Sequence, residues 1–355
     1  MNEIHNNTFS NTTVFLSVES KHSLPILIAL SIGNVAGIIV GTTGNCLVVL
    51  VVMFNREMRS STNLFIASLS VADFLVTGIC MPIFFGYNVI AWPSWLFGDI
   101  TCWMVSYLVH VSVMASTLNL LSISYDRFMF VYLPTKKVMT IKRAKCVVCL
   151  IWFVSPLLLL PSALHHKVVT VVQRGKTFDK CQENWDTEKQ LHIYQMYRVV
   201  LYVLFMAQIS LVYFLIGYRL KKLQLPGYQT SANKKKVLLQ RLKVIKISFL
   251  VVVCFGLCWL PYVINKLLNI FPPSKVFKVP DIFVFVGNFL GLLNSCINPI
   301  LYAVLNRNFS KAFKNVLRCR WNYTVEERRK RVSQPHSLQD KHTTSREGRH
   351  HDATI

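Results

Sequence analysis

Charged residues are scarce in this sequence. They make up 15% of its 355 residues, and only 16 are acidic, whereas an ordinary soluble domain has roughly 25% charged residues. Hydrophobic residues make up 53%, and the mean hydropathy is +0.41. A soluble chain of this length needs more polar surface, and a disordered chain has fewer aromatic residues. The composition excludes both classes and favours a membrane protein.

Several other patterns are missing. We find no Ser-His-Asp arrangement, glycine-rich phosphate loop or metal-ligand spacing in a usable context, so we expect no enzyme. Residues 1–24 lack the apolar core of a cleaved signal peptide, and the first apolar run is expected to serve as its own insertion signal. Six of the ten cysteines lie in apolar runs and are expected to be core residues: Cys46, Cys80, Cys149, Cys254, Cys258 and Cys296.

Long apolar runs are the dominant feature of the sequence. A helix that crosses the bilayer needs roughly 20 apolar residues. Seven runs reach that length, at about 25–53, 62–89, 101–133, 146–163, 194–219, 245–268 and 281–305. None alternates as a barrel strand does, and no inverted repeat supports a transporter. The predicted fold is all-α: a seven-transmembrane helix bundle over residues 25–305.

Basic residues gather on one side of the predicted membrane. The segment from Arg219 to Lys246 has nine basic residues and no acidic one, and the tail after residue 305 has 12 basic and 5 acidic residues. By the positive-inside rule, the tail is cytoplasmic and residues 1–24 lie outside. Sequons at Asn6 and Asn11 agree with a glycosylated outer leader. Topology and anionic lipid account for the basic charge, so we expect no nucleic-acid partner.

Polar residues inside the spans form a second pattern. Asp73 is the only acidic residue well inside the bilayer. Oxygen-bearing side chains stand at a matching depth in other spans: Asn45, Ser116, Asn294, Ser295 and Asn298. These are ligands of a hard cation, for which Na⁺ fits. A neutral hydrogen-bonded cluster that only joins helices is the other interpretation.

Three features suggest moving parts, two of them inside spans and one at the end of a span. Pro261 and Pro299 each remove a helix hydrogen bond and predict a kink. The large side chain of Trp259 lies two residues before the first kink. Asp126 and Arg127 close the third span at its inner end, where an arginine can bridge to other helices.

Together these residues resemble the rhodopsin-like (class A) G-protein-coupled receptors over about residues 28–318. The resemblance follows the family motifs in order: Gly44-Asn45, Leu69 to Asp73, Cys102, Asp126-Arg127-Phe128, Trp152, Phe255 to Pro261, and Asn298 to Tyr302. It implies a plasma-membrane receptor that binds an extracellular ligand and activates heterotrimeric G proteins. A membrane transporter or channel is the alternative.

The resemblance also implies roles for residues. Cys102 and Cys181 would form a disulfide. Asp73, Ser116, Asn294 and Asn298 would form an inhibitory sodium site. Phe255 and Trp259 would belong to the switch beneath the ligand pocket, while Arg127, Tyr213 and Tyr302 would rearrange on activation. Three positions depart from the family pattern: Phe128 replaces a tyrosine, Phe205 replaces the usual proline of the fifth span, and Leu292 replaces the lysine of opsins.

The ligand is expected near the outer ends of the spans. Val109 stands where amine receptors carry an aspartate, so an amine ligand is not expected. His110, Arg198, Tyr262 and Lys266 predict a pocket for an anionic group of a lipid, nucleotide or peptide; His165, His166 and Lys167 lie above it. In the alternative, Arg198 and Lys266 reach to the membrane interface and His110 is a core residue. The loop acids Asp179, Glu183, Asp186 and Glu188 could instead meet a basic peptide. The segment from Leu293 to Asn308 resembles melatonin-type and medium-chain-fatty-acid-type receptors.

The C-terminal part divides in two. Residues 306–319 predict an amphipathic eighth helix at the membrane surface. Cys319 is either palmitoylated or a bare thiol. Residues 320–355 have the composition of a disordered tail. Its possible phosphorylation sites, through which receptor kinases and arrestin would act, are Ser333, Ser337, Thr343, Thr344 and Ser345.

Overall fold

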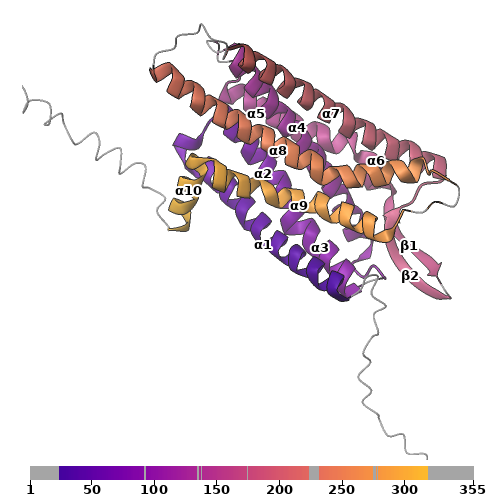
Figure 1. Cartoon of the computed structure of the whole chain (residues 1–355). Coiled ribbons are helices and arrows are strands. Elements are labelled where there is room, and N and C mark those ends of the chain that lie inside the picture. Colours follow the sequence, from indigo (N-terminus) through magenta and orange to yellow (C-terminus); the bar gives the residue numbers. More distant parts are fainter. Residues whose placement is uncertain are drawn as a thin grey trace, which may run out of the picture.

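The computed structural model describes residues 24–91, 93–133, 136, 138–173, 175–223, 232–274, 277 and 279–318. Within these residues, seven helical segments are long and apolar enough to cross a membrane. They form one bundle, with a β-hairpin at one end and a short helix, α10, at the other (Figure 1). The predicted seven-span bundle is confirmed. The sequons at Asn6 and Asn11, Cys319 and the tail lie outside the described residues.

The spans follow one another along the chain. In order they are α1 (Leu24–Phe54), then α2 (Ser61–Leu75), η2 (Val76–Cys80), α3 (Met81–Phe85) and η3 (Gly86–Ala91), then α4 (Gly98–Tyr132), α5 (Ile141–Leu158) with α6 (Leu160–His165), α7 (Glu188–Leu223), α8 (Ala232–Ile270) and α9 (Asp281–Leu305). The short η1 (Arg56–Met58) follows α1. Hydrocarbon offers no water to backbone amides and carbonyls, so continuous helices are the favoured way across.

Several helices run beyond the predicted spans. The fourth begins at residue 141 and not 146, the fifth at 188 and not 194, and the sixth at 232 and not 245. Hydropathy marks the part of a helix inside the bilayer. Lysine, arginine and glutamate are good helix formers, so the helix continues into water where hydropathy has already fallen.

The second span is the irregular one. Two π-helical segments, η2 and η3, flank the five-residue α3. Pro82 lies in the first turn of α3, and proline supplies no amide hydrogen to the turn before it. Such wide turns occur mostly as single interruptions of an α-helix and often lie near functional sites. Here η3 lies beside the cavity described below.

Helix α4 passes through the middle of the bundle, where it packs against α2, α5, α6 and α7. Helix α9 packs against α8, α1 and α10. The core between them is apolar, and Phe65, Leu120 and Phe255 are almost completely buried. The Trp152 indole donates a hydrogen bond of 3.0 Å to the Ser68 hydroxyl and so joins α5 to α2. The expectation that Cys149 is a core residue is wrong, because it lies on the exposed side of α5.

The hairpin consists of β1 (His166–Gln173) and β2 (Lys176–Glu183), paired antiparallel with His166 opposite Glu183. Gly175 allows the tight turn between them, since its φ of 75° is unfavourable for other residues. The Cys102–Cys181 disulfide fastens β2 to the start of α4. This confirms the disulfide implied by the family resemblance. The hairpin itself was not predicted from the sequence.

The final helix, α10 (Arg307–Leu317), lies across the end of the bundle opposite the hairpin (Figure 1). The Asn306 side chain caps it by accepting a hydrogen bond of 3.1 Å from the Asn308 amide. Phe309 and Phe313 are buried against the bundle, whereas Leu317 is exposed. The aromatic pair therefore fixes the position of this helix against α9 and α1.

The close approach of α1 to α9 generates a prediction. A Cβ atom on Gly44 would lie 2.7 Å from Cβ of Pro299, and the proline ring cannot rotate away. We expect Gly44→Ala to destabilise the protein by about 1–3 kcal/mol, as overpacking does. Thermal unfolding of the purified protein in detergent checks this. Gly217→Ala is the matched control, because a Cβ there meets nothing within 4 Å; equal unfolding temperatures for the two variants would contradict the prediction.

Candidate functional site

A cavity of about 370 Å³ opens within the bundle at the hairpin end. Its wall contains every residue that the sequence predicted for the ligand pocket: Val109, His110, Arg198, Tyr262 and Lys266. The hairpin contributes His166 and Cys181, and the amides of Asn34, Asn88 and Asn288 lie on the wall formed by α1, η3 and α9. Most of the remaining wall is aromatic or aliphatic. A concave, largely apolar site with a few convergent polar groups is typical of a ligand site.

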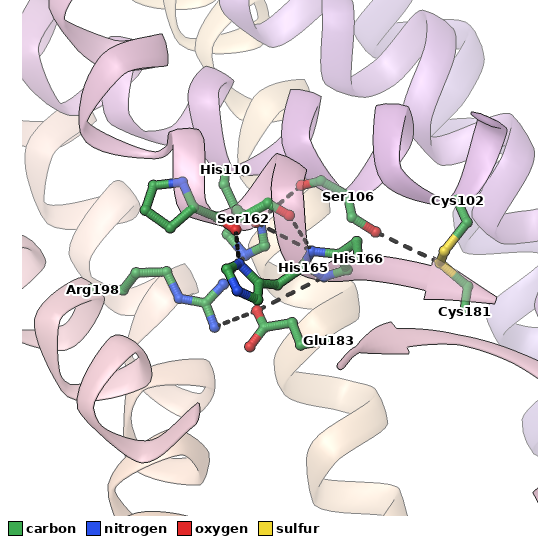
Figure 2. Close-up of polar contacts among 10 residues, drawn as sticks. Cys102, Ser106, His110, Ser162, His165, His166, Cys181, Glu183 and Arg198 are labelled. Atoms are coloured by element: carbon green, nitrogen blue, oxygen red, sulfur yellow. Dashed lines mark hydrogen bonds and ion pairs between the residues drawn. A yellow bond between two sulfur atoms is a disulfide. The ribbon is translucent and has the colours of Figure 1, made fainter. Parts of the chain in front are cut away.

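A charged cluster holds one side of this cavity in place (Figure 2). Arg198 Nη2 lies 2.6 Å from Glu183 Oε1, and Arg198 Nη1 lies 2.7 Å from His110 Nε2. His166 Nε2 lies 3.7 Å from the same carboxylate oxygen of Glu183. The side chains of Arg198 and Glu183 are about nine-tenths buried, with 10% and 11% exposure. The ion pair therefore joins the hairpin to α7 beneath the surface.

Hydrogen bonds determine the protonation of His110. Its Nδ1 lies 2.7 Å from the carbonyl oxygen of Ser106, which can only accept, so Nδ1 carries the proton. Nε2 then accepts from the guanidinium of Arg198, and the ring is neutral. His166 lies outside the spans, and burial lowers the pKa of its imidazole despite the opposing effect of Glu183. Both rings are thus neutral at neutral pH.

The structure places the four loop acids in different environments. Glu183 lies inside, on Arg198, and Asp179 accepts a hydrogen bond of 2.7 Å from Thr170. Asp186 and Glu188 are exposed. Arg198 does not reach to the membrane interface, because its side chain is buried in the cluster. This pairing could not be predicted from the sequence, because 15 residues separate the partners and only the strand register brings Glu183 back to the bundle.

Aromatic side chains form the floor of the cavity. The rings of Trp259 and Tyr262 pack edge-to-face with centroids 5.5 Å apart, and Trp259 lies 6.4 Å from Phe255. A Cβ on Gly291 would lie 3.1 Å from the Trp259 ring, so the glycine leaves room for the indole. Pro261 lies within α8 directly beside this cluster. Trp259 thus stands two residues before the proline on the same helix, at the floor of the cavity.

The fifth span lacks the family's proline, and its helix is continuous there. Phe205 lies in the uninterrupted α7, and its side chain packs against a buried cluster that includes Val111 and Leu159. Phe255 instead stacks with Tyr202 at 6.3 Å, one turn closer to the hairpin end. Unlike proline, Phe205 has a backbone N–H, so the helix is regular at this position and has no bulge. Aromatic packing holds α7 against α8.

Below the floor, buried polar side chains surround Asp73. Asn298 donates a hydrogen bond of 2.7 Å to the Asp73 carboxylate, and the Ser116 and Ser295 hydroxyls also hydrogen-bond to it. Asn45 donates to the Ser295 carbonyl at 2.9 Å, while its own Oδ1 is buried without a hydrogen-bond partner. Asn294 is buried as well. Carboxylate, hydroxyl and carboxamide oxygens around an orphaned acceptor fit the ligand set of a hard cation such as Na⁺.

At the α10 end, the helices close around Arg127. Its guanidinium donates to the Thr62 hydroxyl and lies 3.4 Å from Asp126, whose carboxylate accepts a 2.5 Å hydrogen bond from the same hydroxyl. Tyr213 and Tyr302 are buried near this arginine. The cavity beside Arg127, which Tyr302 and Asn306 help to line, is only about 50 Å³. The arrangement links α2 to α4 and leaves little space at this end.

Phe128 and Tyr132 form a pair that the sequence analysis did not anticipate. Their rings stack at 4.4 Å, and the Tyr132 hydroxyl donates a hydrogen bond of 3.0 Å to the Leu215 carbonyl. Phe128 itself, in place of the family's tyrosine, has no hydroxyl. The link between α4 and α7 is therefore made one helical turn further along.

Comparison with known proteins places this geometry in a family. The 7 transmembrane receptor (rhodopsin family) pattern matches residues 44–302. The QRFP-like peptide receptor of Branchiostoma floridae is 31% identical over 288 residues, 79% of this chain and 74% of that protein. The allatostatin-A receptor of Bombyx mori is 35% identical over 284 residues (79% and 77%), and the prokineticin receptor 2 of Mus musculus is 30% identical over 284 residues (78% and 74%). By this match the chain belongs to the rhodopsin family of seven-transmembrane receptors, as its motifs predicted, and is not a transporter, channel or enzyme.

Proposed function

We propose that this receptor lies in the plasma membrane with its hairpin end outside, binds the end of an extracellular peptide in the 370 Å³ cavity, and activates heterotrimeric G proteins at the α10 end. The orientation is supported by the basic residues that gather at the α10 end. The cavity is the observation that carries the proposal. Its volume is near the low end of ligand sites, about 300–1,000 Å³, so only the end of a peptide enters.

The names of the relatives favour a peptide over the other ligands that the sequence left open. One relative is named as a peptide receptor, and two others as allatostatin-A and prokineticin receptors. The cavity agrees with this choice because amide groups contribute to its wall. The side-chain nitrogens of Asn34 and Asn88 each donate at 2.8 Å to the carbonyl four residues earlier in the same span. The carboxamide oxygen of each is left as an acceptor for a peptide N–H.

Activation follows as a shift between two states. In the closed state, Arg127 is held by Thr62 and Asp126. A peptide that presses on Trp259 favours bending at Pro261, because the indole packs against Tyr262, the residue that follows this proline. Bending separates α8 from α4 at the α10 end, widens the cavity that α8 helps to line beside Arg127, and so exposes Arg127 to a G protein. The peptide shifts the equilibrium only by its stronger binding to the open state.

Asp73, Ser116, Asn294 and Asn298 would hold Na⁺ and so stabilise the closed bundle, with Ser295 and Asn45 supporting them. The ion supplies positive charge to the buried carboxylate. The side chains themselves connect α1, α2, α4 and α9. After activation, the tail recruits receptor kinases and arrestin through its serines and threonines.

The first experiment tests peptide activation and the role of Arg127 together. Cells expressing the intact chain are challenged with peptides of the allatostatin-A, prokineticin and QRFP types, and with fatty acids and nucleotides, while activation of each G-protein class is recorded. We expect a peptide response that Arg127→Ala reduces at least about tenfold at unchanged surface expression, a loss of about 1.4 kcal/mol in coupling. Lys311→Ala, an exposed basic residue at the same end, is the control.

Activation by a fatty acid or nucleotide alone would reject the peptide ligand. Full signalling by the Arg127 variant would reject the proposed release of Arg127. These two results are independent, because one concerns the hairpin end and the other the α10 end.

A second experiment tests the sodium site without a ligand. Basal G-protein activation in isolated membranes is compared in NaCl and in KCl of equal ionic strength. We expect Na⁺ to lower the basal rate of the natural protein by about fivefold, a coupling of about 1 kcal/mol, and Asp73→Asn to remove the difference. Asp99→Asn is the control, since that carboxylate accepts from the Val168 amide at the hairpin end. Equal Na⁺ sensitivity in the Asp73 variant would refute the assignment.

A further inference from the structure

The charges in the cavity wall do not contribute equally to ligand binding. Arg198 carries a full positive charge, but Glu183 lies 2.6 Å from it on the hairpin. Glu183 does not belong to the cavity wall, whereas Arg198 does. The carboxylate therefore backs the guanidinium and cancels its charge at longer range. Arg198 keeps its N–H donors but adds almost no net charge.

The two histidines of the cavity wall are neutral and add no charge to it. His110 donates from Nδ1 to Ser106 and accepts from Arg198 at Nε2, which leaves no site for a second proton. His166 donates from Nδ1 to the Ser162 carbonyl at 2.7 Å. A proton on its Nε2 would meet Glu183, but burial among cations opposes it. Neither ring offers a charge to a ligand at neutral pH.

Lys266 is the remaining cation of the wall. Its Nζ lies 5.4 Å from the centre of the Tyr262 ring, a contact that steadies the ammonium without neutralising it. In the described part of the chain, no carboxylate lies within ion-pair distance of Lys266. The side chain is half-buried and lines the cavity. A partly desolvated ammonium without a counter-ion attracts an anionic group strongly.

We propose that the cavity selects a peptide end bearing one carboxylate, which Lys266 binds, and that Glu183 limits the selection to a single charge by neutralising Arg198. The inference rests on the proposed peptide receptor and specifies which peptides fit it. Apolar surface follows directly beside the lysine, with Tyr262 and Trp259 on the same helix. The carboxylate is therefore accompanied by an aromatic or aliphatic side chain. It comes either from the peptide's C-terminus or from an aspartate or glutamate side chain.

The test measures the electrostatic potential of the cavity without any agonist. A cysteine is introduced at Val109, which lines the cavity, in the full-length receptor. Two methanethiosulfonate reagents, one bearing a sulfonate and one a trimethylammonium group, react with this cysteine. Mass spectrometry follows each reaction and distinguishes the introduced cysteine from the native ones. The ratio of the two rates cancels any change in the reactivity of the thiol itself. Gln195→Cys, on another wall, provides a second position if Val109→Cys folds poorly.

We expect the ratio of the anionic-reagent rate to the cationic-reagent rate to be higher at the introduced cysteine than on a free thiol. Lys266→Ala should lower the ratio by about fivefold, and Glu183→Gln should raise it by a similar factor, because one unit charge a few ångströms away acts in each case. Lys176→Ala removes an exposed lysine of the hairpin and should leave the ratio unchanged. A ratio equal to that of a free thiol, or one insensitive to Lys266, overturns the proposal. So does a fall in the ratio with Glu183→Gln.

Small probes then distinguish the source of the carboxylate. N-acetylphenylalanine carries a terminal carboxylate, and N-acetylaspartylphenylalanine amide carries one on a side chain. Each is tested at millimolar concentration for protection of the introduced cysteine, against N-acetylphenylalanine amide as the neutral control. Protection by the first or the second acid assigns the source, and equal protection by all three overturns the proposal. A cavity that favours the anionic reagent in a receptor that no peptide activates would reject the peptide function alone.

Discussion

The cost of burying an unpaired polar group in a water-free interior governs this structure. In the bilayer the backbone meets that demand by forming helices, but buried side chains must find partners on other helices. Asp73 does so with Asn298, Ser116 and Ser295, and Arg198 does so with Glu183. Each such cluster ties together elements that hydrophobic packing alone would leave free to slide. The same demand makes the clusters sensitive, because any ligand or ion that changes a partner changes the packing around it.

The two ends of the bundle are built in opposite ways. At the hairpin end, a disulfide and an ion pair hold the hairpin beside an open cavity. At the other end, Arg127 and its neighbours bring the helices together over little free space. Between them lie Trp259, Pro261 and the polar side chains around Asp73. In the activation proposed above, a small contact at the hairpin end would produce a larger displacement at the α10 end, because α8 runs from one to the other.

The sequence was sufficient for the seven-span bundle, for the charged residues of the cavity wall and for the polar residues that the structure gathers around Asp73. Long apolar runs determine the spans because the thickness of the bilayer fixes their length, and Asp73 is conspicuous because acids are rare in such runs. The hairpin and the partner of Arg198 were not predictable in the same way. Glu183 has the exposed character of any loop acid, and its burial depends on the register of β1 with β2. Helix ends were also misplaced, since hydropathy reports the membrane boundary and not the end of the helix.

The wide turns of the second span affect how this receptor can be compared with others. A π-turn accommodates one extra residue, and each residue of an α-helix advances by about 100° around the axis. Every side chain beyond η2 is therefore rotated relative to a helix that lacks such a turn. Tyr87 and Asn88, which line the cavity, lie beyond η2 and are subject to this rotation. A relative with a regular second span would present different side chains at the aligned positions, so pocket residues of this span must be matched by direction in space and not by count along the chain.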